Sequence, residues 1–282
     1  MDQESAQTIT DQPATPADKN TLPSGPRILV VEDNPVMASI MGKLLGRFEA
    51  RFDVVANGLE AIDAAKEADY DLILMDILMP TLGGVRSTQA IRKLSSHYEN
   101  IPIIAVTARV SERAEEEYLA EGMTGMIKKP INRVNLSEAL RTHLGLEENI
   151  PISIESESAI HDRDDLDALN WEVFNEYRSL LGDSFMGFLK DYLTVGPNML
   201  SDIGDAITAD DAPRIQFLAH KLKSTAQVFG AESAADLAAQ LEIMGKNNET
   251  GPAPQIFHEL HIAYERTQRA LRKKYILMQN MG

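Results

Sequence analysis

The sequence has no cysteine, which excludes disulfide bridges and thiolate chemistry. It has no apolar run long enough to span a membrane, and its first residues, MDQESAQTIT, lack the basic and apolar regions of a secretory signal. Basic residues are outnumbered: 27 Lys and Arg against 43 Asp and Glu give a formal net charge of −16, which argues against a nucleic-acid-binding output. We therefore expect a cytoplasmic chain that makes no direct membrane contact.

The chain of 282 residues suggests two domains joined by polar segments. Residues 1–26 and 146–164 are polar and lack hydrophobic periodicity, so we interpret them as a disordered leader or linker and an interdomain linker. Over residues 27–145, short apolar segments alternate with helix-like stretches, which predicts an α/β doubly wound five-stranded parallel sheet. The predicted strands are 27–31, 51–55, 71–75, 101–106 and 124–127, and the predicted helices lie near 35–48, 58–68, 84–96, 111–121 and 133–144.

No strand pattern follows the second polar segment. Over residues 165–280, apolar residues recur at helical spacing, which predicts an all-α antiparallel bundle. The dipeptide Gly196-Pro197 predicts a break or kink in the second helix of this bundle. The predicted helices are 165–182, 184–200, 201–211, 212–230, 231–248 and 252–278.

Polar side chains follow four of the five predicted strands, namely Glu32, Asp33, Asp76, Thr107 and Lys129. The carboxyl ends of parallel strands meet at one edge of a sheet, so these side chains are expected to converge. Three neighbouring carboxylates repel one another and need a hard cation such as Mg²⁺. A carboxylate beside that metal can accept a phosphoryl group, which the hydroxyl and the ammonium can then hold. The pattern predicts a phosphoryl-transfer site.

Part of this set also has a purely structural interpretation. Asp33 or Asn34 followed by Pro35 is a good helix start, because Asp and Asn cap helices and Pro suits the first turn. Capping alone would not place suitable side chains after three further strands, so we favour the phosphoryl-transfer site.

Residues 27–145 resemble the receiver domain of two-component response regulators through the segments PRILVVEDNPVM, DLILMDILMP, GG, IPIIAVTA and EGMTGMIKKPI. The resemblance implies a flavodoxin-like fold with Asp76 as the phosphoacceptor. The implied Mg²⁺ ligands are Glu32, Asp33, Asp76 and the backbone carbonyl of Leu78. The resemblance further implies that Thr107 and Lys129 contact the phosphoryl group, that Lys128 points to the other face, and that the Lys129–Pro130 peptide is cis.

Two positions depart from the receiver pattern. Met126 stands where many receivers carry a Tyr or Phe switch residue, which puts the usual coupling of the threonine to an aromatic side chain in question. Leu78, two residues after the acceptor, is aliphatic. Our hypothesis is that Leu78 shields an acyl phosphate on Asp76 from water and so favours transfer over hydrolysis.

The segment AHKLKS followed by FGAE resembles the signature of histidine phosphotransfer (HPt) domains, which are four-helix bundles with one phosphorylatable histidine. The resemblance implies that His220 carries the phosphoryl group, with Lys223 near it to offset charge. Ser224 replaces the glycine usual in the family and keeps the position small. On a helical projection His220 and Lys223 fall opposite the apolar stripe, so we expect the imidazole to be exposed to solvent. A plain solvated face is the alternative for the segment taken alone.

Together the two resemblances imply a phosphorelay, in which a histidine kinase phosphorylates Asp76 in a Mg²⁺-dependent reaction and the group passes to His220 and then to a separate response regulator. No ATP-binding kinase domain is recognisable in this sequence, so its status as an enzyme is left open as a phosphotransfer intermediate. A phosphorylation-gated binding module and a phosphate sink are the alternatives. The chain is either free-standing or the C-terminal part of a hybrid sensor kinase; in the second case it would be the cytoplasmic portion of a membrane sensor.

Overall fold

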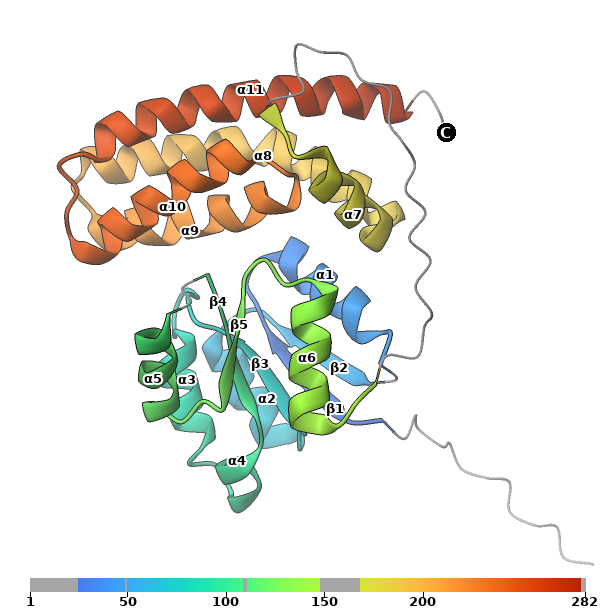
Figure 1. Ribbon diagram of the computed structural model, residues 1–282. Helices are drawn as coiled ribbons and strands as arrows, with labels where there is room; N and C mark the ends of the chain where they lie inside the picture. The colour runs from blue at the N-terminus through green and yellow to red at the C-terminus, as the bar shows by residue number, and fades with distance from the viewer. Residues whose placement is uncertain (1–24, 49, 109–110, 148–167, 280–282) are drawn as a thin grey trace, which may run out of the picture.

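The computed structural model describes residues 25–48, 50–108, 111–147 and 168–279. It shows an α/β part with a bundle of long helices lying across one end of it (Figure 1). The predicted leader and linker fall almost wholly outside the described residues. Among the described helices, none is long and apolar enough to cross a membrane.

The α/β part contains a five-stranded, all-parallel sheet in the order β2-β1-β3-β4-β5, which confirms the predicted fold. The strands are β1 (Arg27–Val31), β2 (Arg51–Val55), β3 (Leu72–Asp76), β4 (Ile103–Thr107) and β5 (Gly125–Lys128). The helices are α1 (Pro35–Leu45), α2 (Gly58–Glu67), α3 (Gly84–Ile91), α4 (Ser96–Asn100), α5 (Glu112–Ala120) and α6 (Arg133–Leu144).

Alternate residues of the central strands enter two separate apolar cores, one on each face of the sheet. Ile28 and Leu72 pack with α1 and α6, whereas their neighbours Leu29 and Ile73 pack with α2, α3 and α5. Both faces are covered, which explains why β3 and β4 are buried throughout and read as continuous apolar runs. With both faces closed, functional groups are left to the edge where the strands end.

The helix predicted over 84–96 is shorter than expected. It ends at Ile91, because the next amides bond three residues back, Lys93 to Ala90 and Leu94 to Ile91, and tighten the chain into a turn. The short helix α4 then begins at Ser96. The prediction of one helix over this stretch is therefore wrong.

The C-terminal part is helical, as predicted. It consists of α7 (Trp171–Leu181), α8 (Asp183–Thr208), α9 (Ala212–Val228), α10 (Glu232–Asn247) and α11 (Ala253–Gln279). The last four are the long helices of the bundle in Figure 1, where α11 lies farthest from the sheet and α9 and α10 lie nearest to it.

A helix break at Gly196-Pro197 is not observed, because α8 runs through both residues and also includes the segment predicted as a separate helix over 201–211. Proline cannot donate to the carbonyl four residues back. That carbonyl, of Leu193, instead accepts hydrogen bonds from Gln268 Nε2 at 3.2 Å and from Arg272 at 3.1 Å, both on α11. Donors from a distant helix thus replace the missing backbone bond and keep α8 continuous.

Helix α7 links the two parts. Its buried residue Tyr177 belongs to an apolar core that continues from Leu44 and Leu45 of α1 into the bundle. The Tyr177 hydroxyl also donates to the backbone carbonyl of Ile131, in the loop after β5, at 3.3 Å. The bundle is therefore packed on the α/β part through α7 and α1.

Candidate functional site

Three carboxylates meet at the carboxyl edge of the sheet. Glu32 and Asp33 follow β1, and Asp76 is the last residue of β3, the neighbouring strand. One oxygen from each lies within 4.8 Å of the others. Gly84 allows the chain to pass closely here, because a Cβ on that residue would lie 2.1 Å from the Asp76 carbonyl oxygen. The strand order therefore assembles the acidic cluster.

Lys129 is the cation inside this cluster. Its Nζ lies 2.8 Å from Glu32 Oε2 and 2.8 Å from Asp76 Oδ2, and all three side chains are almost completely buried. Burial would lower the pKa of Lys129, but the two carboxylates hold it above its ordinary value. Burial together with the negative charge of Asp76 raises the pKa of Glu32 to about 8, although Lys129 opposes this effect. The neighbouring Lys128 is exposed, and the Lys129–Pro130 peptide is cis, as predicted.

The donor set fits a hard divalent cation. Carboxylate oxygens are the ligands that Mg²⁺ prefers, and Lys129 already bridges two of the three carboxylates with its positive charge. The backbone amide of Leu78 donates to Asp76 Oδ1 at 3.1 Å, so Leu78 lies directly beside the acceptor. The backbone carbonyl of Leu78 as a metal ligand remains a prediction.

Thr107 ends β4 on the strand next to Asp76 and is buried. Its hydroxyl lies 3.3 Å from the hydroxyl of Tyr118 on α5. Met126, on β5, packs at the border of the core on the α2, α3 and α5 face. Thr107 therefore does have an aromatic partner, Tyr118, but this residue comes from a helix and not from the position of Met126 on β5.

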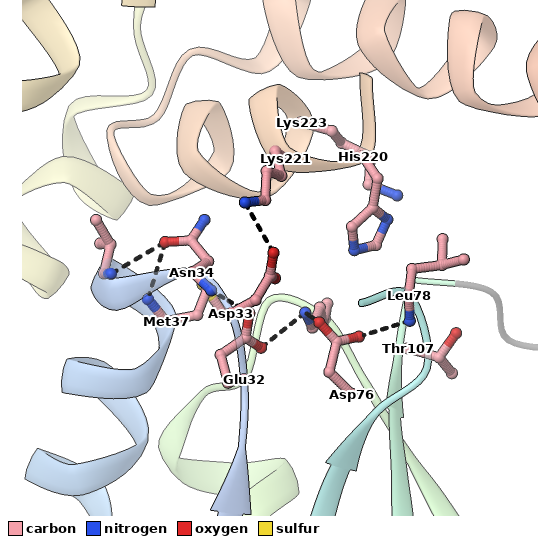
Figure 2. A network of polar contacts seen from close by, with 12 residues as sticks. Glu32, Asp33, Asn34, Met37, Asp76, Leu78, Thr107, His220, Lys221 and Lys223 are labelled. Carbon is pink, nitrogen blue, oxygen red and sulfur yellow. Dashed lines mark hydrogen bonds and ion pairs between the residues drawn. The ribbon is translucent and has the colours of Figure 1, made fainter. Parts of the chain in front are cut away.

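His220 is buried, with 3% of its surface exposed, so the prediction of a solvent-exposed imidazole is wrong. Figure 2 shows its ring projecting from α9 toward the edge of the sheet that carries Asp76, with Leu78 close by. The polar face of α9 is covered because the bundle sits against this edge. Lys221 Nζ lies 2.8 Å from Asp33 Oδ2, and Asn34 Nδ2 donates to Thr225 Oγ1 at 2.9 Å.

Glu242 on α10 was not anticipated as a functional residue. Its Oε1 lies 2.9 Å from His220 Nδ1, and its Oε2 pairs with Lys223. Burial would raise the pKa of Glu242, but the hydrogen bond and charge of His220, together with the charge of Lys223, hold it below the ordinary value. His220 Nε2 is buried and has no hydrogen-bond partner among the described residues. An ionised carboxylate can only accept a hydrogen bond, so the contact with Glu242 assigns a proton to Nδ1.

The position of Glu242 opposite His220 could have been predicted from the antiparallel hairpin of α9 and α10. His220 and Glu242 lie equally far in sequence from Ala231, at the turn between the two helices, so an antiparallel pairing brings them opposite each other. Tyr118 and Lys221 had no such signal. Tyr118 reaches Thr107 from a neighbouring helix of the α/β part, and the partner of Lys221, Asp33, lies in the loop after β1, in the other part of the fold.

Known proteins match both parts of the chain. Residues 28–141 match the family model of the response regulator receiver domain, and residues 187–270 match that of the Hpt domain. Transcription factor SKN7 of Chaetomium thermophilum is 36% identical over 169 residues, which are 57% of this chain and 22% of that protein. Signal transduction histidine-protein kinase BarA of Escherichia coli K12 is 26% identical over 218 residues, which are 76% of this chain and 23% of the kinase.

The chain thus spans less than a quarter of the length of these two relatives. Among solved structures, the receiver domain of sensor histidine kinase PA1611 from Pseudomonas aeruginosa, with a magnesium ion coordinated in its active-site cleft, is 36% identical. The match covers 43% of this chain and 99% of that structure, with a TM-score of 0.40. On the two family-model matches, the chain belongs to the two-component signalling proteins, with a response regulator receiver domain followed by an Hpt domain.

Proposed function

We propose that this chain relays a phosphoryl group from a histidine kinase to Asp76, from Asp76 to His220, and from His220 to the receiver of a separate response regulator. The observation that carries the proposal is the buried, unpartnered Nε2 of His220, whose ring projects toward the edge holding Asp76 (Figure 2). A buried imidazole nitrogen without a hydrogen bond is costly, and a role in chemistry accounts for that cost. The receiver domain is proposed to extend over 27–145 and the HPt domain over 165–280.

Asp76 accepts the phosphoryl group in this scheme. Glu32, Asp33, Asp76 and the backbone carbonyl of Leu78 would hold Mg²⁺, which neutralises charge on the phosphoryl oxygens when it is bound. Lys129, now bridging Glu32 and Asp76, would turn to a phosphoryl oxygen.

Thr107, at the end of the adjacent strand, would donate its hydroxyl to another phosphoryl oxygen, with Tyr118 fixing the rotamer through the 3.3 Å contact. Leu78 lies beside the acceptor and close to the imidazole in Figure 2, which supports its proposed role in keeping water away from an acyl phosphate. Water exclusion favours transfer over hydrolysis.

Transfer to His220 uses the neutral imidazole with its proton on Nδ1. The Nε2 lone pair forms the P–N bond, the P–O bond to Asp76 breaks, and the electron pair returns to the Asp76 carboxylate. The imidazole becomes positively charged, and Glu242 stabilises that charge through its bond to Nδ1 at 2.9 Å. Lys223 neutralises the Glu242 carboxylate before transfer and would offset charge on the transferred group.

The packed arrangement favours transfer within one chain. The bundle is held on the receiver by the shared apolar core of α1 and α7 and by the bond between Tyr177 and Ile131. Two reactants held on one folded chain react at an effective concentration far above that of separate molecules. We therefore place the first acceptor and its histidine in the same molecule.

Incubation with radiolabelled acetyl phosphate and Mg²⁺ tests the proposal. In the unaltered chain we expect an acid-labile label on His220, and in Asp76→Asn we expect none on either residue. In His220→Gln the label should remain on Asp76. Transfer within one chain predicts a rate independent of protein concentration, and mixing Asp76→Asn with His220→Gln should not restore label on His220 at that rate.

Two outcomes would overturn the relay. A chain that is labelled on Asp76 but never on His220, while gaining affinity for a partner, would be a phosphorylation-gated binding module. Rapid loss of label from Asp76, without accumulation on His220 or on an added response regulator, would indicate a phosphate sink.

A further inference from the structure

An ion pair joins the helix that carries His220 to the acidic cluster. Lys221 Nζ of α9 lies 2.8 Å from Asp33 Oδ2, with 28% of the lysine side chain and 6% of the aspartate side chain exposed (Figure 2). One turn along α9, Thr225 accepts the hydrogen bond from the Asn34 side chain. The contact thus rests on Asp33, one of the three carboxylates placed to hold a metal, and on its neighbour.

We propose that Lys221 competes with the divalent cation for Asp33, so that packing of the HPt domain on the receiver depends on whether the receiver is metal-free, metal-bound or phosphorylated. The proposal rests on the relay function above. We call the ion pair between Lys221 and Asp33 the latch.

The charge of the cluster decides the strength of the latch. In the metal-free protein, three carboxylates face one ammonium, that of Lys129, so the cluster is negative and attracts Lys221. It stays negative when the Glu32 carboxyl is protonated, because two carboxylates still face one ammonium. Mg²⁺ held by this cluster would add two positive charges, and Asp33 would be one of its ligands, so the attraction for Lys221 would be lost and the latch would open.

Phosphorylation restores the attraction. The Asp76 carboxylate loses its own charge when it becomes an acyl phosphate, but the phosphoryl group brings two negative charges, so the metal-bound cluster becomes negative again. Lys221 is then drawn back, and His220 on the same turn of α9 returns to the phosphoryl group. Docking is therefore weakest in the metal-bound, unphosphorylated state, which is the state in which an incoming kinase must reach Asp76.

Lys129 and Lys223, the lysines paired with carboxylates at the two sites, cannot act in this way. Lys129 belongs to the receiver and is buried within it, so it stays with the cluster whether or not the domains are packed. Lys223 pairs with Glu242 inside the bundle and has its counter-charge in its own domain. Among the described residues at this contact, Lys221 is the lysine that forms an ion pair with a carboxylate of the other domain.

The test uses the full chain, Lys221→Met, and Lys190→Met as a matched control on an exposed position of α8. Mg²⁺ affinity is measured by calorimetry, and accessibility of His220 by its rate of modification with diethyl pyrocarbonate, read by mass spectrometry of the peptide. We expect Lys221→Met to bind Mg²⁺ about fivefold more tightly, the lower end of typical coupling between sites, and Lys190→Met to match the unaltered chain.

In the unaltered chain, saturating Mg²⁺ should raise the modification rate of His220, and Mg²⁺ with beryllium trifluoride, a phosphoryl mimic, should lower it again. In Lys221→Met the rate should be high throughout and unresponsive to Mg²⁺. The latch is overturned if Mg²⁺ leaves the rate unchanged in the unaltered chain, or if Lys221→Met binds Mg²⁺ with unaltered affinity. Failure of the relay is separate: His220 would then respond to Mg²⁺ while no label passes from Asp76.

Discussion

The two ends of the proposed path balance charge differently. At Asp76, a buried lysine of the receiver pairs with two of the three carboxylates, and the third, Asp33, pairs with Lys221 of the bundle, so the receiver on its own carries excess negative charge there. At His220, one carboxylate, Glu242, serves both the imidazole and Lys223 within two neighbouring helices. In the proposed relay the first site would therefore need an added cation before it accepts a phosphoryl group, whereas the charges of the second site balance within the bundle.

The largest effect should come from removing the buried cation of the first site. Lys129→Met leaves the Glu32 and Asp76 carboxylates buried without their counter-charge, which costs about 3 kcal/mol in the free energy of unfolding. Urea unfolding in EDTA measures the loss. Saturating Mg²⁺ should restore part of it, because a bound cation stabilises the folded state.

Lys128→Met is the control, because Lys128 is exposed on the adjacent position. We expect its free energy of unfolding to change by less than about 0.5 kcal/mol. Equal losses in the two variants, or a loss in Lys129→Met that Mg²⁺ does not reduce, would contradict the assignment of Lys129 as the internal counter-charge.

The second site should respond in its chemistry rather than in its metal dependence. Glu242→Ala removes the partner of His220 Nδ1 and of Lys223, and we expect transfer from Asp76 to His220 to slow by roughly one to two orders of magnitude. Glu242→Gln keeps an oxygen acceptor for Nδ1 and should recover part of the rate. Nitrogen NMR of the imidazole should show the proton on Nδ1 in the unaltered chain and mixed tautomers in Glu242→Ala.

The exposed pair of His261 and Glu265 on α11 provides the control for this prediction. Its atoms are 3.4 Å apart and both side chains are about half exposed, so Glu265→Ala should leave the rate unchanged. A Glu242→Ala chain with an unaltered rate and an unaltered tautomer would show that Glu242 only fills space between the helices.

The first site should also make the stability of the folded chain depend on pH, through Glu32. Glu32 has a pKa of about 8 in the folded chain against an ordinary 4.5, so between these values the folded chain retains a proton that the unfolded chain has released. This stabilising proton is fully bound below pH 4.5 and is lost as the pH rises through 8. The free energy of unfolding in EDTA should therefore fall across this window by up to about 1.4 kcal/mol per pH unit.

Urea unfolding at several pH values, with Glu32→Gln as the reference, measures this slope. The glutamine variant should lack the decline that Glu32 causes, and Mg²⁺ should flatten it in the unaltered chain by stabilising the ionised carboxylate. Identical slopes in the two chains would mean that the Glu32 carboxyl is ionised throughout the window.

The receiver site was largely predictable because strand ends are local features. The apolar runs of β3 and β4 end at Asp76 and Thr107, and parallel strands bring their ends to one edge whatever the rest of the chain does. The bridging position of Lys129 between Glu32 and Asp76 could not be predicted, because the sequence does not show which of several nearby carboxylates a flexible lysine side chain contacts.

The surroundings of His220 were less predictable because they depend on a second domain. The helical projection of α9 places Leu222 on the apolar face and His220 on the polar face. A polar face can be covered by another domain instead of being exposed to water, and the projection does not distinguish these cases. Pro197 gives the same lesson for local rules. A break or kink was expected there, but α8 is continuous, and Gln268 and Arg272, which are distant in sequence, donate to the carbonyl that proline cannot reach.

The smallest predicted effect tests whether the two sites are held together by contacts away from the chemistry. Tyr177→Phe keeps the apolar packing of α7 but removes the hydrogen bond to the Ile131 carbonyl, in the loop that follows Lys129. The lost bond is worth about 1 kcal/mol, so transfer from Asp76 to His220 should slow about fivefold, with Mg²⁺ affinity little changed.

Tyr192→Phe is the matched control, because the buried hydroxyl of Tyr192 has no hydrogen-bond partner among the described residues. Removing an unpartnered hydroxyl should leave the transfer rate unaltered and stability equal or higher. If Tyr177→Phe behaves like Tyr192→Phe, the apolar core shared by α1 and α7 is sufficient to hold the domains. If Tyr177→Phe slows transfer as expected, the HPt domain aligns the loop that follows Lys129. The two sites are then positioned relative to each other by this hydrogen bond as well as by the ion pair of Lys221.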